Sequence, residues 1–192
     1  MIVSRETEEK LKIYEALLHK WQKVINLVSS QTLPKAWERH FIDSAQIYDY
    51  VSRETKGPYL DVGSGAGFPG MVLSLCGLSD VTLIESDQRK IEFLKTVKRE
   101  THASVTLLCE RVETVEKPYR TLLMRGFRSI KESFSLTQHL MTSETSYVMW
   151  KGEHYVQEID DANKEWSFQW HTIGSITKEG SAILHIYNIA KK

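Results

Sequence analysis

The chain has 192 residues, of which 41% are hydrophobic and 26% are charged, and its formal net charge is zero. These values are those of an ordinary soluble globular protein, and they argue against a surface coated in basic residues. No apolar run approaches the ~18 residues needed to span a bilayer, and no signal peptide opens the chain. We therefore expect a cytoplasmic monomer with one sizeable core. Cys76 and Cys109 lack metal-ligand spacing, so no metal site is expected.

The first part of the chain predicts two helices. Apolar residues recur at helical spacing over residues 5–25, and Pro34 opens a second amphipathic stretch after a turn-forming segment at 26–30. We expect residues 1–57 to form a helical segment packed on a domain of residues 58–192. The pattern leaves open whether this segment is a lid over a ligand or a cover for one sheet edge.

From Pro58 onward, strand and helix patterns alternate, which predicts a mostly parallel, doubly wound α/β sheet with helices on both faces. Two strand-like runs near the end, 167–173 and 182–189, predict a closing antiparallel hairpin. The other expected strands are 58–62, 81–85, 104–109, 121–124 and 145–150, and the expected helices lie near 69–77, 88–100, 128–141 and 153–165.

The stretch 59–70 predicts a strand, a tight turn and a helix start. An apolar run ends in Asp61, and the alternate residues Gly63, Gly65 and Gly67 lack a Cβ atom. Such glycines permit positive φ and close approach, so backbone N–H groups at the helix start can meet the polar part of a nucleotide-like ligand.

A second acid strengthens this interpretation. Glu85 ends the next predicted strand about twenty residues after the loop, where nucleotide-binding folds place a ribose-binding carboxylate. A lone glycine pattern would also suit a dinucleotide, or a tight turn without any ligand. The acid-first form D-x-G-x-G-x-G is narrower, and it resembles the first motif of class I methyltransferases, which bind S-adenosylmethionine.

Several further stretches stand in a specific order. They are Lys20-Trp21, Asn26-Leu27, Arg39-His40-Phe41-Ile42-Asp43-Ser44, the loop DVGSGAGFPG, Arg111-Val112-Glu113, Arg125-Gly126-Phe127 and Lys151-Gly152. In this order and spacing they resemble the glucose-inhibited division protein B family, bacterial methyltransferases that act on N7 of a guanine in small-subunit (16S) ribosomal RNA. The resemblance runs from about residue 11 to the end of the chain, and its specific parts are the Arg-His-x-x-Asp-Ser stretch and the Gly-Phe-Pro-Gly end of the loop.

The resemblance implies a role for residues around the cofactor. Val112 and Glu113 are expected beside the adenine, and Arg125 is expected to close the site. The guanidinium of Arg125 can hold the cofactor carboxylate or an RNA phosphate, and a surface ion pair is the alternative. The expected contacts to S-adenosylmethionine are Asp61, Gly63, Gly65, Gly67, Phe68, Glu85, Val112, Glu113 and Arg125.

Basic residues are unevenly distributed. Residues 86–131 hold eleven Lys or Arg against six Asp or Glu, which suits a face that binds a polyanion, although solvated helix faces would look the same. Ribosomal RNA or the small ribosomal subunit is the expected partner. The predicted RNA contacts are Arg39, Arg125, Arg128, Lys131 and Lys151, with Lys20 and Lys23 as further possibilities.

No catalytic side chain is expected. His40 and Asp43 lie three residues apart on a predicted helix, and we favour a packing and capping network over a catalytic pair because no nucleophile accompanies them. Guanine N7 has a free lone pair, so its methylation needs alignment rather than a base. The alternatives are a methyltransferase of small molecules or proteins, a nicotinamide-binding oxidoreductase, and a non-catalytic RNA-binding module.

Overall fold

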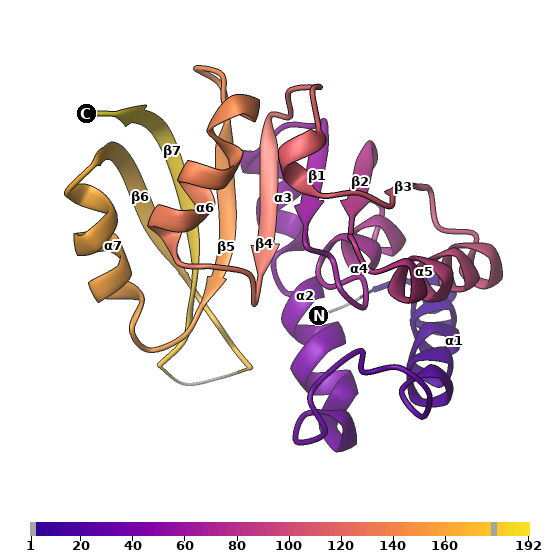
Figure 1. Ribbon diagram of the computed structural model, residues 1–192. Helices are drawn as coiled ribbons and strands as arrows, with labels where there is room; N and C mark the ends of the chain where they lie inside the picture. The colour runs from indigo at the N-terminus through magenta and orange to yellow at the C-terminus, as the bar shows by residue number, and fades with distance from the viewer. Residues whose placement is uncertain (1–2, 178–179) are drawn as a thin grey trace.

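A computed structural model describes residues 3–177 and 180–192. Its centre is a seven-stranded sheet in the order β3-β2-β1-β4-β5-β7-β6, in which β7 runs antiparallel to both of its neighbours and the other pairs are parallel (Figure 1). This confirms the predicted doubly wound sheet with a closing hairpin. The strands are β1 (Tyr59–Val62), β2 (Val81–Ile84), β3 (Val105–Leu108), β4 (Thr121–Arg125), β5 (Ser146–Lys151), β6 (Trp166–Gly174) and β7 (Ala182–Lys191).

Helices cover both faces of the sheet. Tyr59 of β1 belongs to a core cluster shared with α1 to α5, whereas its neighbour Leu60 belongs to a cluster shared with α6 and α7. The central strands are therefore apolar on both sides, as buried parallel strands are. No helix in the described residues is long and apolar enough to cross a membrane. The helices are α1 (Arg5–Trp21), α2 (Asp43–Ala45), α3 (Tyr48–Glu54), α4 (Gly70–Leu75), α5 (Gln88–Thr101), α6 (Ile130–Thr137) and α7 (Tyr155–Asn163).

The first helix ends earlier than its apolar pattern predicts. The Ser4 hydroxyl caps its start by accepting from the Thr7 N–H at 3.1 Å, but α1 stops at Trp21 rather than at residue 25. The Gln22 side chain explains the difference, since its Oε1 accepts from the N–H groups of Leu27 and Val28 at 2.9 and 3.0 Å. This side chain supplies the partners that a longer helix would have provided, and the chain turns back.

The second predicted helix is present, but it is not a regular α-helix. The chain instead forms a 3-10 turn at Leu33–Lys35, a π-helical turn at Trp37–Ile42, and then the short helices α2 and α3. Aromatic packing accompanies the wide turn, because Phe41 is 1% exposed and stacks on Trp37 with ring centroids 5.4 Å apart. Turns of this kind occur often at functional sites.

Tyr14 joins α1 to the glycine loop after β1. Its ring is fully buried and stacks on Phe68 at 5.4 Å between centroids, and its hydroxyl donates to the carbonyl of Ala66. Gly67 has φ +90°, and a Cβ atom there would lie 2.5 Å from the Tyr14 oxygen. The helical segment and the glycine loop therefore share one core.

We expect Tyr14→Phe to lower the free energy of unfolding by about 1–3 kcal/mol, because the buried Ala66 carbonyl would lose its donor. Urea unfolding of the two proteins measures the difference. Tyr155→Phe is the matched control, since the Tyr155 hydroxyl has no hydrogen bond among the described residues. Equal losses in the two variants would contradict a specific role for the Tyr14 hydroxyl.

Candidate functional site

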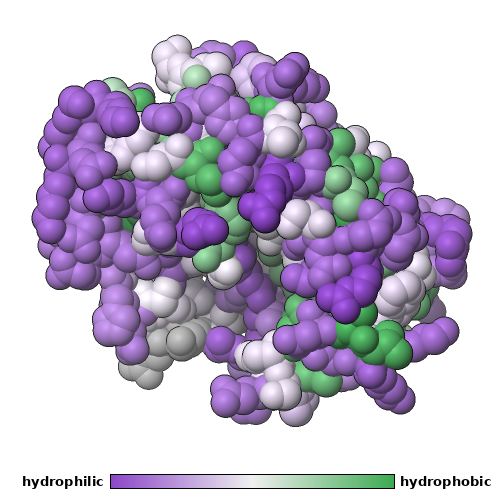
Figure 2. Space-filling view, viewed as in Figure 1, coloured by the Kyte–Doolittle hydropathy of each residue, from purple (hydrophilic) through white to green (hydrophobic). Residues whose placement is uncertain are grey.

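A cavity of about 610 Å³ lies at the carboxyl edge of the sheet, where the strands deliver their last residues. Four parts of the chain form its walls: the glycine loop with Glu85 and Lys90, the segment from Leu27 to Asp43, the ends of β4 and β5, and the hairpin. In Figure 2 the surface is hollowed below its centre, between the parts that hold the hairpin and the N-terminal helices, and both hydrophilic and hydrophobic groups border the hollow. The cavity is open to a ligand from this side.

A second cavity of about 350 Å³ adjoins the first. The two share Gly63 and Glu85, and Val112, Glu113 and Phe127 line the second one. Val112 and Glu113 belong to a 3-10 turn after β3, at the same sheet edge as the glycine loop. The structure therefore brings most of the residues that were predicted to contact the cofactor into the lining of two adjoining cavities, which meet at Glu85.

Two glycines of the loop meet different requirements. Gly63 has φ +66°, and a Cβ atom there would lie 2.7 Å from the Phe127 ring. Gly65 has φ +57°, and its Cβ position meets nothing closer than the Gly63 carbonyl at 3.8 Å, so it faces open space. Gly63 lets an aromatic ring pack on the loop, and Gly65 lets a ligand approach the backbone.

Glu85 stands where the two cavities meet. Its side chain is mostly buried, and its two oxygens accept from the N–H groups of Gly65 and Asp87 at 3.0 and 2.9 Å. Lys90 Nζ lies 3.9 Å from Oε2. Because a carboxylate oxygen has two lone pairs, each oxygen can still accept from a ligand hydroxyl. This geometry agrees with the predicted ribose contact.

Asp61 and Gly67 support the loop from beneath and line neither cavity. Asp61 is 1% exposed, and its Oδ2 accepts from the Gly70 N–H at 2.9 Å, while Oδ1 has no hydrogen-bond partner among the described residues. Burial raises the pKa of Asp61 to about 7, against the lowering effects of the Gly70 N–H and Arg125. Direct contact of these two residues with the cofactor remains a prediction.

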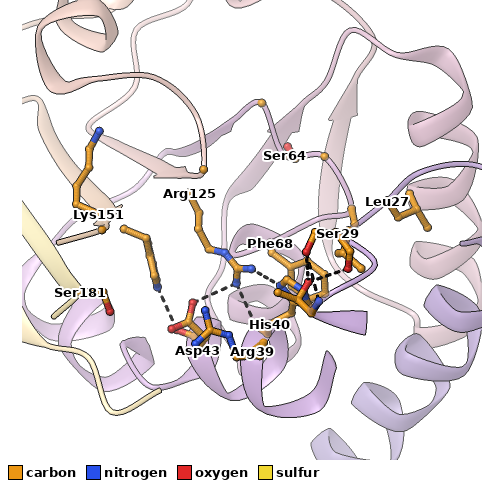
Figure 3. Close-up of a pocket in the computed structure, with 18 of the residues that line it drawn as sticks. Leu27, Ser29, Arg39, His40, Asp43, Ser64, Phe68, Arg125, Lys151 and Ser181 are labelled. Carbon is orange, nitrogen blue, oxygen red and sulfur yellow. Dashed lines mark hydrogen bonds and ion pairs between the residues drawn. The ribbon is translucent and has the colours of Figure 1, made fainter. Parts of the chain in front are cut away.

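Arg125 crosses from the end of β4 to the π-helical turn, as Figure 3 shows. Its Nη1 lies 3.2 Å from Asp43 Oδ2, and its Nη2 donates to His40 Nδ1. The guanidinium carbon lies 5.3 Å from the centroid of the Phe68 ring. With 16% of its side chain exposed, Arg125 is a buried bridge rather than a surface ion pair.

The protonation state of His40 follows from these contacts. Burial, together with the nearby Arg125 and Arg39 charges, lowers the pKa of His40 to about 3, so the ring is neutral at physiological pH. A guanidinium only donates, so His40 Nδ1 accepts and the proton is on Nε2. That nitrogen donates to Thr32 Oγ1 at 2.9 Å. His40 and Asp43 therefore both position Arg125, in agreement with the packing interpretation.

The predicted RNA contacts on the other side of the cavity are paired with acids. Lys131 Nζ lies 2.6 Å from Glu165, and Arg128 Nη1 lies 3.9 Å from Glu132. Lys151 Nζ is 2.7 Å from a Glu158 oxygen and points away from Arg125 in Figure 3. Arg39, which lines the cavity, donates to the Thr177 carbonyl at 3.1 Å. RNA binding by these residues remains a prediction, and three of them lie within ion-pair distance of a glutamate.

Sequence reasoning missed several groups at the site. Tyr14, Thr32 and Phe127 act through tertiary contacts that no local pattern reveals, although the stretch Arg125-Gly126-Phe127 stood out. The hairpin contribution, which includes Ser175 and Ile183, was also missed. In residues 3–177 and 180–192, no three His, Cys, Asp or Glu side chains gather as metal ligands.

This fold, with a glycine loop after β1 and an acid after β2, defines a class I methyltransferase. Solved structures share the fold. The ribosomal protein L11 methylase of Lactobacillus delbrueckii subsp. bulgaricus has a TM-score of 0.60 at 9% identity, covering 76% of each chain. Magnesium protoporphyrin IX methyltransferase from Synechocystis PCC 6803, solved with bound SAM, has a TM-score of 0.57 at 11% identity, covering 96% of this chain and 97% of that one.

The chain belongs to the GidB family, described as rRNA small subunit methyltransferase G, whose family model matches residues 7–187. Relatives named ribosomal RNA small subunit methyltransferase G are similar to this chain in sequence over nearly their whole length. The protein from Rickettsia prowazekii is 39% identical and that from Rickettsia typhi is 38% identical, each over 100% of this chain and 99% of the relative. These matches confirm the family resemblance seen in the sequence motifs.

The raised pKa of Asp61 predicts a specific pH dependence. An unfolded aspartate titrates near pH ~3.9, so between about pH 4 and about pH 7 the native state binds more protons and the free energy of unfolding falls as pH rises. Asp61→Asn keeps an acceptor for the Gly70 N–H and removes this titration. Urea unfolding across this window should show a flatter profile for the variant. Parallel profiles would rule out Asp61 as the titrating group.

Proposed function

We propose that the protein transfers a methyl group from S-adenosylmethionine to small-subunit (16S) ribosomal RNA, and that the acceptor is N7 of a guanine. Family membership over nearly the whole chain supports the reaction class. The observation that carries the proposal is that most of the family-like stretches, far apart in sequence, converge on two cavities that meet at Gly63 and Glu85. An elongated nucleoside ligand and a second substrate need such an arrangement.

The residues present fit S-adenosylmethionine. Glu85 has lone pairs for ribose hydroxyls, Gly65 leaves its backbone open to approach, and Val112 offers an apolar wall in the second cavity. When bound, this cofactor supplies an electrophilic methyl group on a sulfonium. Arg125 and Phe68 form a fixed wall of the first cavity, so the protein contributes orientation and charge placement there.

The acceptor is inferred from the bases in the first cavity. His40, Asp43 and Glu85 are its possible proton acceptors, and each already accepts hydrogen bonds from protein groups. The pKa of His40, lowered to about 3 by burial, makes it a poor base. A nucleophile that carries a free lone pair, such as guanine N7, suits a site whose bases are all engaged. An exocyclic amino group would need a proton removed.

The experiment for this function follows labelled methyl transfer from S-adenosylmethionine to 16S ribosomal RNA, and maps N7-methylguanine in RNA from cells with and without the protein. We expect one labelled guanine that disappears with the protein. Label on another atom would overturn the N7 assignment. Absence of transfer to either naked RNA or small subunits would favour a small-molecule or protein substrate, or a binding module. Titration with NAD tests the oxidoreductase alternative, which family membership disfavours.

We expect Glu85→Ala to weaken binding of S-adenosylmethionine by about 1.5–3 kcal/mol, because it removes charge-assisted hydrogen bonds to the ribose. Isothermal titration calorimetry with the cofactor measures the change. The same titrations with adenosine and with methionine locate it, since only adenosine binding should weaken. An unchanged dissociation constant for the cofactor would falsify the ribose role.

A further inference from the structure

One part of the helical segment differs in charge from the rest of the chain. Residues 16–37 contain no aspartate or glutamate, yet they include Lys20, Lys23 and Lys35. All three lysines are exposed, and so are the neutral polar residues between them, Asn26 and residues 29–31. We call residues 16–37 the acid-free segment. In a chain with zero net charge, this is a local positive surface.

The acid-free segment is held in a defined shape at the mouth of the first cavity. Gln22 fixes its first half by bonding to both the N–H and the carbonyl of Val28, at 3.0 and 2.9 Å. Thr32 fixes its second half, through the Ser29 carbonyl at 3.0 Å and through His40. Leu27, Val28, Ser29 and Thr32 line the cavity itself. The lysines therefore belong to a segment that forms an ordered wall of the site, and Figure 3 shows Ser29 near Phe68 with Leu27 farther along the same wall.

The cations on the two sides of the cavity differ in their partners. Arg128, Lys131 and Lys151, from the end of β4 to β5, each lie within ion-pair distance of a glutamate. Lys20 and Lys23, like Lys35, have no ion pair with any acid in the described part of the chain. An RNA phosphate can pair with these lysines without displacing a carboxylate.

We propose that the acid-free segment is the surface on which the RNA backbone docks, with its lysines on the phosphates and the target base directed into the adjoining cavity. The inference rests on the proposed function and names the substrate-binding side of that site. Phosphate contacts supply most nucleic-acid affinity and fix orientation, and the exposed hydroxyl and amide groups at 29–31 add neutral hydrogen-bonding partners. Glu15 and Glu38 mark the ends of the docking surface, because like charges repel phosphate there.

The test compares two triple variants in binding to a 16S ribosomal RNA transcript across a range of salt concentrations. The first is Lys20→Gln, Lys23→Gln and Lys35→Gln. Its matched control is Lys56→Gln, Lys98→Gln and Lys117→Gln, three exposed lysines that precede β1, β3 and β4 at the opposite sheet edge. Both variants lose the same charge, so a difference between them reports position.

We expect the first variant to flatten the slope of log affinity against log salt by about 2 to 3, at roughly 0.7–0.9 per lost phosphate contact, and the control to keep the wild-type slope. The KM for RNA should rise in the first variant while binding of S-adenosylmethionine stays unchanged. A wild-type slope in the first variant overturns the inference, as does an equal loss in the control. Arg128→Gln with Lys131→Gln tests the other side, and a larger loss there also overturns it.

The same experiment separates this inference from the proposed function. Methyl transfer by the wild-type protein tests the reaction, whereas the variant slopes test the docking surface. If the wild-type protein methylates RNA but the first variant keeps the wild-type salt slope, only the docking proposal is defeated. RNA binding through this segment without methyl transfer to the transcript or to small subunits defeats only the reaction, and a wild-type protein that binds neither the transcript nor small subunits defeats both.

Discussion

The site depends on one buried cation and the neutral imidazole beside it. Arg125 can lie against His40 only while that ring stays unprotonated, because a charged imidazole would have no lone pair to offer and would repel the guanidinium. Asp43 balances the Arg125 charge and also accepts from the hydroxyl of Thr177. Asp43, which follows the π-helical turn, thus links that turn to Arg125 at the end of β4 and to Thr177 in the hairpin connection. Removing Asp43 would leave the largely buried charge of Arg125 without this carboxylate, which is costly.

The sequence predicts the local features of this protein well. The strands are short apolar runs, and the glycine loop with Glu85 needs only spacing along the chain, so both could be found without coordinates. The bridge between Arg125 and His40 joins residues 85 positions apart, and the tautomer of His40 depends on that bridge. The π-helical turn also escaped prediction, because its apolar spacing resembles that of an α-helix and tertiary packing decides between them.

Charge counting along the sequence also misses tertiary contacts. The basic surplus at 86–131 ignores acids supplied from outside that window, and Glu144 and Glu165, which pair with Arg120 and Lys131, are two of these. A stretch that lacks acids altogether has no acid of its own with which its lysines could pair. The acid-free segment was visible in the sequence, but its place on a cavity wall was not. Charge becomes informative about binding once the fold shows which charges are already paired.

Two walls of the cavity come from parts of the chain that lie far apart in the sequence, and this has a consequence for folding. Residues near 27–43 form one wall, while another includes Ser175 and Ile183, and β7 must insert between β5 and β6 before that wall exists. A partly folded chain in which β7 has not yet paired lacks the part of the cavity wall that contains Ile183. The cavity therefore takes its complete shape only when segments far apart in the sequence have packed together.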